Sequence, residues 1–350
     1  MKKETFRLII RFLVGTALSL MLCAGMIMTE KLGSNKPLIQ QASGLKGTET
    51  VMTVDGEPVS AEEYLYMVSY SAQTLSYYGV TDLSVELGEG YTAADYVANQ
   101  AESQAVQQAV IRKWAKDVGV TLTEEDQAVL QAQKDAYGDD FQTLLKVNGI
   151  SEAQYDQLIG TSLLYDRLYS AYCAEGGNLR PSDSDLTAMA ENHGLMTADV
   201  LFISTAELDD DGKADAKALM EDYARQIGAA EDRAAAFAAL ETGENVTVTT
   251  GATYDNCEET VLNTALAALA ENEVSGVIED EGGCYVALRR ATDLSAVAEM
   301  AFGEDMSARM ANAQVEHNDA VYSRINVAAY YTKFSAARQK LYAQLQETQE

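Results

Sequence analysis

The sequence predicts an α+β protein in which helical segments at both ends of the chain flank a smaller α+β unit. Apolar residues recur at helical spacing over residues 51–190 and again over residues 299–350. Between them, over residues 191–298, the pattern becomes strand, two helices, strand, helix and two strands, which is the order of a small α+β domain. The length of 350 residues also exceeds what one hydrophobic core usually serves, so more than one domain is expected.

The composition is that of a folded and strongly acidic chain. It is 47% hydrophobic and 23% charged, and 54 Asp and Glu against 25 Lys and Arg give a formal net charge of −29. A body with this charge repels phosphate backbones, so no nucleic acid partner is expected. The two histidines, His193 and His317, are too few and too far apart in sequence for a His-rich metal site or a Ser-His-Asp triad. The four cysteines form no CxxC pair, and neither a metal nor a cofactor is expected.

Residues 1–28 have the layout of an export signal or a membrane anchor. Four Lys and Arg residues precede the apolar run Phe12–Met28, so everything after this run is expected outside the cytoplasm. Three outcomes stay open: an uncleaved anchoring helix, a lipid on Cys23 at the end of the run Leu-Met-Leu-Cys, or cleavage and release. Residues 29–50 show little periodicity and are expected to form a flexible linker.

Local start and stop signals place the elements of the N-terminal segment. Residues 51–59 form a β-like run with an Asp-Gly turn. Ser60 and Glu63 match a capping box, which predicts a helix from Ser60 to Gly79. Further helices are expected, in order, from Thr92 to Gly119, after Thr123, up to Asn148-Gly149, and from the capping box of Ser151 and Gln154 to Gly176-Gly177.

These pieces together resemble a known family. The order VDGEPVSAEEY, a long helix, and then GVTLTEEDQAVL and NGISEAQYDQLI resembles the N-terminal domain of the PrsA/SurA family of exported foldases, over about residues 51–190. The resemblance implies that the tail, residues 299–350, packs back on this domain and completes a chaperone lobe built from both chain ends. It also implies unfolded or nascent exported polypeptides as partners. A generic helical bundle is the alternative.

The middle segment resembles the parvulin type of peptidyl-prolyl cis-trans isomerase domain. The stretch LAENEVSGVIEDEGGCYVALRR and the opening strand ADVLFIS carry this resemblance. It implies that Phe237, where the family's helix has a phenylalanine, contacts substrate. The two histidines of the family correspond here to Asp199 and Tyr285, which makes catalysis doubtful. Prolyl isomerisation breaks no bond and needs an apolar pocket with suitable polar groups, so these two residues could keep part of the network by sharing one hydrogen bond.

The sequence therefore predicts an extracytoplasmic folding factor, tethered to the cell membrane through its N-terminal segment or secreted. The alternative is a non-catalytic scaffold or partner-binding protein of the cell envelope. Cys257 and Cys284 could pair in an oxidising location, although two buried free thiols are favoured, and Cys173 is expected in a core. Most of the 19 tyrosines and 12 methionines are expected to fill cores, and the remainder would suit an adaptable surface for unfolded chains.

Overall fold

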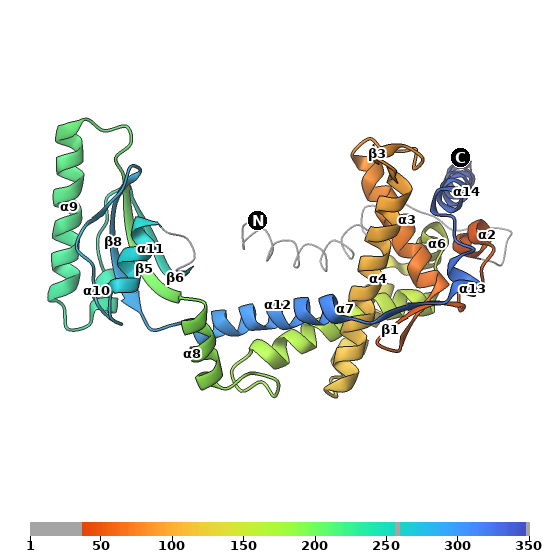
Figure 1. The fold of residues 1–350 in the computed structure, drawn as a ribbon, viewed down its shortest axis with the longest axis horizontal. Coiled ribbons are helices and arrows are strands. Elements are labelled where there is room, and N and C mark those ends of the chain that lie inside the picture. The colour runs from red at the N-terminus through yellow and green to blue at the C-terminus, as the bar shows by residue number, and fades with distance from the viewer. Residues whose placement is uncertain (1–36, 256–259, 348–350) are drawn as a thin grey trace. The chain divides into compact units, whose positions relative to one another are not determined.

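The computed structural model describes residues 37–255 and 260–347, so the predicted anchor and the predicted lipidation site Cys23 lie outside the described residues. None of the helices in these two ranges is long and apolar enough to cross a membrane. The chain forms two compact units: unit 1 holds residues up to Ser170 and from Asp305 onwards, and unit 2 is Ala171–Glu304 (Figure 1). Helices dominate and the sheets are small and antiparallel, so the predicted α+β class, with a mainly helical unit built from both chain ends, is confirmed.

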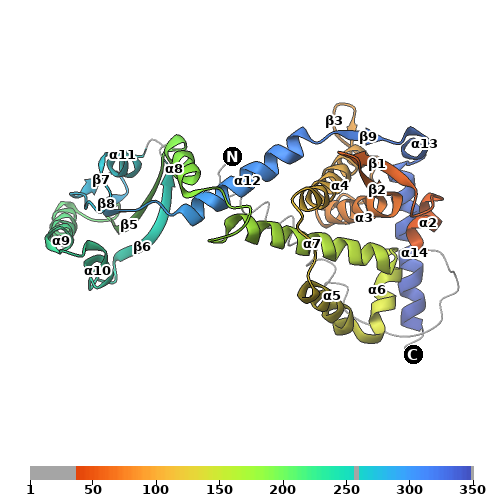
Figure 2. The same ribbon diagram turned by 90° about the horizontal axis from the view of Figure 1, so that it is seen from below.

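Unit 1 combines helices with a three-stranded sheet. β1 (Thr50–Val54) pairs with β2 (Glu57–Ser60) through the predicted Asp55-Gly56 turn, where φ is +49° and +79°, as a type I′ turn requires. β9 (Val315–His317) adds to the other edge of β1, and Figure 2 shows this sheet beside α3 and α4. The other elements are α2 (Leu38–Ser43), α3 (Ala61–Tyr77), β3 (Glu86–Gly88), β4 (Tyr91–Thr92), α4 (Ala93–Asp117), α5 (Glu124–Tyr137), α6 (Phe141–Asn148), α13 (Asp319–Tyr322), α14 (Val327–Glu347), most of α7 (Glu152–Cys173) and the end of α12 (Leu294–Asn312).

The helix starts in unit 1 follow the local signals, but both capping boxes named from the sequence are incomplete. Ser151 accepts a hydrogen bond from the Gln154 amide at 3.2 Å, whereas the Ser151 amide itself donates to Glu62 and not to the Gln154 side chain. Thr92 and Thr123 each form a complete capping box with the aspartate three residues later. Ser60 accepts a hydrogen bond from the Glu63 amide at 3.0 Å, but the Glu63 carboxylate does not return to the Ser60 amide. It is buried and pairs with Arg112 of α4 at 2.8 Å. The capping box at Ser60 is therefore only half formed, because the Glu63 carboxylate that would complete it is bound by Arg112 instead.

The predicted linker is wrong for residues 38–43, which form the packed helix α2. Ile39 is 1% exposed and Leu45 just beyond the helix is 3% exposed. Gly149, at the end of α6, has a φ of +72°, and a Cβ there would lie 2.9 Å from Phe334 and 3.0 Å from the Ile39 nitrogen. Helices α2, α6 and α14 thus meet at this glycine. The partners of α2 lie far away in the sequence, and its own six residues show no helical periodicity. The sequence of this segment therefore did not indicate that it packs as a helix.

Unit 2 has the predicted order of strand, two helices, strand, helix and two strands. Its four-stranded antiparallel sheet has the order β6-β5-β8-β7. Helices α9 and α10 cover one face of this sheet and α11 covers the other (Figure 1). The elements are α8 (Asp183–Asn192), β5 (Leu195–Ser204), α9 (Asp210–Ala229), α10 (Arg233–Ala238), β6 (Val246–Asp255), α11 (Val261–Ala268), β7 (Ile278–Glu279) and β8 (Gly283–Arg290).

Helix α8 lies in unit 2, although the sequence placed residues up to 190 in the N-terminal domain. Leu186 and Ala190 of α8 pack against Val297 and Ala301 of α12 and form a separate small core. The start and stop signals of α8 indicated a helix correctly. Which core a helix joins depends on its packing partners, and these came from the far end of the inserted segment.

Candidate functional site

Asp199 lies in the middle of β5, and its carboxylate is held by two neighbours. The partner strand β6 bulges opposite it, and Gly251 in the bulge has a φ of +61°. The Gly251 amide, which the bulge leaves without a ladder partner, donates a hydrogen bond to Asp199 Oδ1 at 2.7 Å. Arg290 of β8 pairs with the other carboxylate oxygen. Asp199 is 3% exposed, so it stabilises the bulge and the end of β8 rather than facing a substrate.

Tyr285 of β8 has partners of its own. Its hydroxyl donates to Asp280 Oδ2 at 3.0 Å, and its ring lies 4.7 Å from the ring of Phe202. Burial, and after it the hydrogen bond to Asp280, raises the pKa of the Tyr285 hydroxyl above its usual value. The hydroxyl is therefore a neutral donor near pH 7.

Asp199 and Tyr285 lie on opposite faces of the sheet. In the register of β5 and β8, Asp199 is paired with Leu288, and Phe202 is paired with Tyr285. Residues three apart on a strand point to opposite faces, so Asp199 faces the α9 and α10 side and Tyr285 faces the α11 side. The hydrogen bond expected between them does not form. The expectation came from matching each residue to a family position along the chain. Such a match contains no information on the register between β5 and β8, and the register determines which face of the sheet each side chain is on.

Phe237 of α10 is a core residue. It is 2% exposed and belongs to the cluster formed by α9, α10 and the sheet face of Leu201 and Val286. This is the face opposite to Tyr285. The structure therefore places Phe237 in the core and not at an accessible surface, because α10 closes over the sheet edge with this side chain inwards.

The α11 face of the sheet keeps an apolar surface. Phe202, Tyr254, Leu262 and Tyr285 are only partly buried there, over a core that includes Leu266. No nucleophile lies beside a base among these side chains, so the chemistry that they support is contact with an apolar group.

The remaining candidates in unit 2 have simple structural roles. His193 caps the C-terminal end of α8, and its Nε2 lies 3.5 Å from a Glu304 carboxylate oxygen, so its role is at the end of this helix. Cys284 is a buried free thiol, and burial raises its pKa. Cys257 lies outside the described residues. The described ranges contain no cluster of His, Cys, Asp and Glu that could hold a metal ion.

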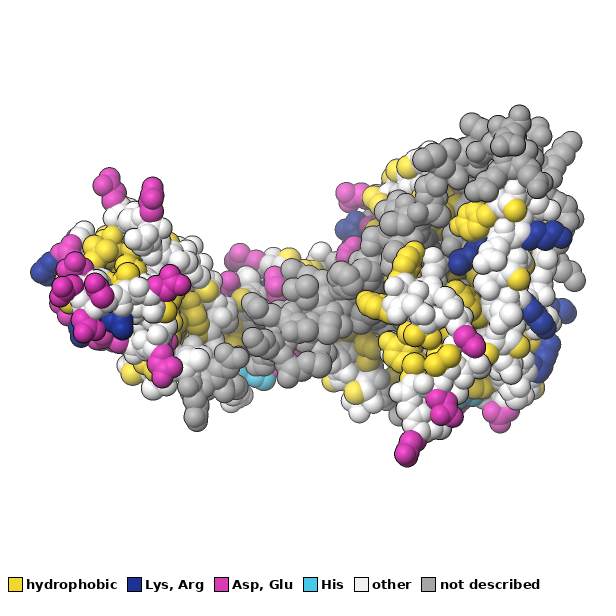
Figure 3. Space-filling view, turned by 90° about the horizontal axis from the view of Figure 1, so that it is seen from above, with side chains coloured by type: hydrophobic (Ala, Val, Ile, Leu, Met, Phe, Trp, Pro, Cys, Tyr) yellow, Lys and Arg dark blue, Asp and Glu magenta, His cyan; other side chains and the backbone are white. Residues whose placement is uncertain are grey.

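Unit 1 exposes a concentration of apolar side chains that the sequence reasoning missed. We call it the hairpin patch, because it follows the chain from the end of α3 through the β3–β4 hairpin into α4. Its exposed fractions run from 37% to 82%, and Figure 3 shows hydrophobic side chains gathered on this unit. The members are Tyr77, Tyr78, Val85, Leu87, Tyr91 and Tyr96. An exposed apolar group of this kind on a folded unit typically marks a surface that binds another protein.

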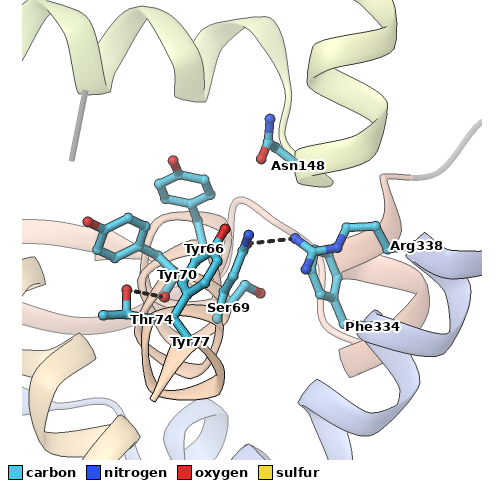
Figure 4. A pocket seen from close by; sticks show the side chains of 9 residues that line it. Tyr66, Ser69, Tyr70, Thr74, Tyr77, Asn148, Phe334 and Arg338 are labelled. Atoms are coloured by element: carbon cyan, nitrogen blue, oxygen red, sulfur yellow. Dashed lines mark hydrogen bonds between the residues drawn. The ribbon is translucent and has the colours of Figure 1, made fainter. Parts of the chain in front are cut away.

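A small hollow lies between α3 and α14, beside the hairpin patch. Its lining includes Tyr66, Tyr70 and Tyr77 of α3, Asn148 at the end of α6, and Phe334 and Arg338 of α14 (Figure 4). The hydroxyl of Ser69, which also lines the hollow, lies 2.7 Å from the buried hydroxyl of Tyr330. The enclosed volume is about 30 Å³, which has room for one or two water molecules and none for a cofactor.

The hollow is lined by one cation, Arg338, and by no acidic residue. Arg338 donates to Gln73 Oε1 at 3.0 Å and lies over the Phe334 ring, 5.3 Å from its centre. Burial raises the pKa of Tyr330 and Tyr331, and the Arg338 charge opposes that rise in both. The sequence does carry a sign of this site: residues 64–81 contain no charged residue at all.

Comparison with known proteins gives similarity in structure only. No family model and no curated protein matches the chain. The structure is similar to PrsA foldases. The foldase PrsA from Lactococcus lactis has 17% identity and a TM-score of 0.30, over 82% of this chain and 99% of that one. The peptidylprolyl isomerase PrsA from Bacillus cereus has 14% identity and a TM-score of 0.33, over 83% of this chain and 99% of that one. A SurA-like chaperone of Campylobacter jejuni has 12% identity and a TM-score of 0.23, over 77% and 98%.

Proposed function

We propose that the protein is an extracytoplasmic folding factor that holds unfolded exported polypeptides on the hairpin patch of unit 1. The observation that carries the proposal is the patch itself, which exposes four tyrosines, a valine and a leucine within twenty residues. Tyrosine combines a large apolar ring with a polar tip, so it can contact many different sequences at low entropic cost. A surface of this kind suits clients that share no motif.

The charge around the patch narrows the class of client. Asp82, Glu86, Glu89 and Asp95 lie in the same stretch of chain. Hydrogen bonds from Ser84 lower the pKa of Asp82, so its carboxylate is charged at neutral pH. An apolar surface with acidic neighbours, on a protein of net charge −29, attracts segments that are both apolar and basic.

The test of holding is a comparison of two matched double variants. Val85→Ser with Leu87→Ser removes two exposed residues from the patch, whose exposed fractions are 45% and 46%. Val129→Ser with Leu219→Ser removes the same residue types, 40% and 37% exposed, from α5 and α9. Suppression of the aggregation of an unfolded basic client by the full chain in detergent is expected to weaken about three- to tenfold for the first variant only, since each lost contact contributes roughly 1 kcal/mol or less.

Equal loss in both variants would contradict the proposal, and so would full activity in the patch variant. Indifference to unfolded chains, together with tight one-to-one binding of a single envelope protein, would instead support the scaffold alternative.

Catalysis of prolyl isomerisation is the second candidate, supported by the half-buried apolar face around Tyr285. We expect the full chain to leave the slow phase of refolding of a proline-limited protein unchanged. Asp199 and Tyr285 face opposite sides of the sheet, so the two residues at the family's histidine positions do not line one pocket. Refolding rates with and without the chain check this, and Tyr285→Phe is the companion variant. A catalytic acceleration that Tyr285→Phe reduces would make the protein an isomerase that works from the α11 face.

A further inference from the structure

We propose that Arg338 binds the C-terminal carboxylate of the held polypeptide, in the hollow between α3 and α14. The inference rests on the proposed holding function and adds to it a defined anchoring point. It predicts that the protein distinguishes the end of a chain from its interior.

The first argument is the unusual state of Arg338 among the arginines. The structure describes ten of them, and six pair with a carboxylate. Three others, Arg180, Arg233 and Arg289, donate to main-chain carbonyl groups. Arg338 donates to a neutral side-chain amide, that of Gln73. In a protein with 54 acidic residues, a guanidinium with no acidic partner in the described chain is available for an anion from outside.

The second argument is that the segments of α3 and α14 that line the hollow carry no acidic residue. Residues 64–81 of α3 and its end carry no charge, and residues 327–346 of α14 carry three cations and no acid. Figure 3 shows Lys and Arg side chains along the right flank of unit 1. These two segments thus bring cations and no acid to the hollow of a protein whose net charge is −29, which favours an anion at this place.

The third argument is the fit of a carboxylate in size and geometry. The hollow holds about 30 Å³, enough for a group of the size of a carboxylate but not for a larger anion such as a nucleotide. Arg338 enters from α14, held over Phe334, and Figure 4 shows it reaching towards α3 and Tyr77. A guanidinium held in this way can bind a carboxylate through two parallel hydrogen bonds.

The connection to the hairpin patch explains why a chain end would enter. Tyr77 lines the hollow and is also a member of the patch, with 67% of its surface exposed. A polypeptide that places its last residue in the hollow can therefore continue across Tyr77 onto the patch. Capture of a C-terminal carboxylate beside a side-chain-binding surface is a known mode of peptide recognition.

The C-terminus is the favoured source of the carboxylate because of the overall charge. Segments rich in Asp and Glu are repelled by a body of −29. The terminal carboxylate is the one anion that every polypeptide carries, including the basic ones that the body attracts.

The test uses one basic and apolar peptide with an N-terminal fluorophore, made as the free acid and as the C-terminal amide. Its affinity for the full chain in detergent is measured by fluorescence anisotropy. The free acid is expected to bind about tenfold more tightly than the amide. Arg338→Gln, which keeps a polar side chain near Gln73, is expected to abolish that preference, and Arg338→Lys is expected to retain part of it.

Lys340→Gln is the matched control. It removes one cation from the same helix, at an exposed position about 200° around the helix from Arg338. The control is expected to keep the tenfold preference. Thermal unfolding of each variant shows whether it is folded, and the ratio of the two affinities within one variant does not depend on its stability.

Two results would overturn the inference and leave the holding function intact. One is equal binding of the acid and the amide by the unsubstituted protein. The other is loss of the preference in Lys340→Gln as well, which would show a diffuse electrostatic effect. Absence of binding for both peptides would overturn the holding function and this inference together.

Discussion

Replacement of Arg112 by methionine is expected to lower the free energy of unfolding of unit 1 by about 3–5 kcal/mol. Glu63 has a side chain with no exposed surface, and Arg112 is its cation at 2.8 Å. The amide of Gln157 would remain 2.8 Å from the other carboxylate oxygen, but it carries no charge. The substitution leaves a buried carboxylate without a counter-charge, and this desolvation is the reason for the large loss.

The loss should depend on pH in a defined direction. Burial raises the pKa of Glu63, and Arg112 opposes that rise, so without Arg112 the pKa in the folded state moves higher still. A carboxyl group whose pKa is higher in the folded state than in the unfolded state destabilises the fold as pH rises through that interval. The variant is therefore expected to be closest to the unsubstituted protein below about pH 4, and to lose most at neutral pH and above.

Urea unfolding followed by the fluorescence of Trp114 measures this effect in unit 1, because Trp114 is the single tryptophan of the chain and lies buried in α4. Lys113→Met is the control, since Lys113 forms an exposed pair with Asp117. It is expected to cost less than about 0.5 kcal/mol. An Arg112→Met loss that is small, or that is the same at pH 4 and pH 8, would show that the carboxylate is not buried as described.

Replacement of Gly283 by alanine is expected to disrupt unit 2 and to leave holding intact. An added Cβ would lie 2.1 Å from the Ile203 carbonyl oxygen and 2.7 Å from the Phe202 ring, so β5 and β8 would have to separate where Ser204 and Gly283 pair. The expected cost exceeds about 2 kcal/mol, since the clash involves main chain that cannot move aside.

Hydrogen exchange of the β5 and β8 amides measures the effect of Gly283→Ala. Gly276→Ala is the control in the same unit, because a Cβ there meets nothing within 4 Å. Faster exchange is expected for Gly283→Ala only, with suppression of aggregation unchanged, since the hairpin patch belongs to unit 1. A parallel loss of holding would move the client site to unit 2.

Local signals were sufficient for most elements of this protein. The threonine caps of α4 and α5, the Asp55-Gly56 turn and the left-handed Gly149 each act within one or two turns of chain. The order of strands and helices in unit 2 was readable for the same reason, because alternation and helical periodicity are properties of short windows.

The site was not readable in the same way. Asp199 and Tyr285 were matched by position along the chain, but a side chain's face depends on the register between two strands that are about 80 residues apart. The hairpin patch shows the same limit. Its tyrosines have the same pattern as tyrosines that fill the core, such as Tyr64, and only the neighbours decide which are covered.

The sequence by itself determined the class of fold, the places where helices begin and end, and the acidic net charge. Tertiary structure alone decided that β9 joins β1, that α2 packs as a helix, and that Arg338 donates to the amide of Gln73. The physical reason is range. Caps, turns and periodicity act between residues a few positions apart, whereas pairing, burial and charge partners join segments that are far apart in sequence, up to more than 250 residues for β1 and β9.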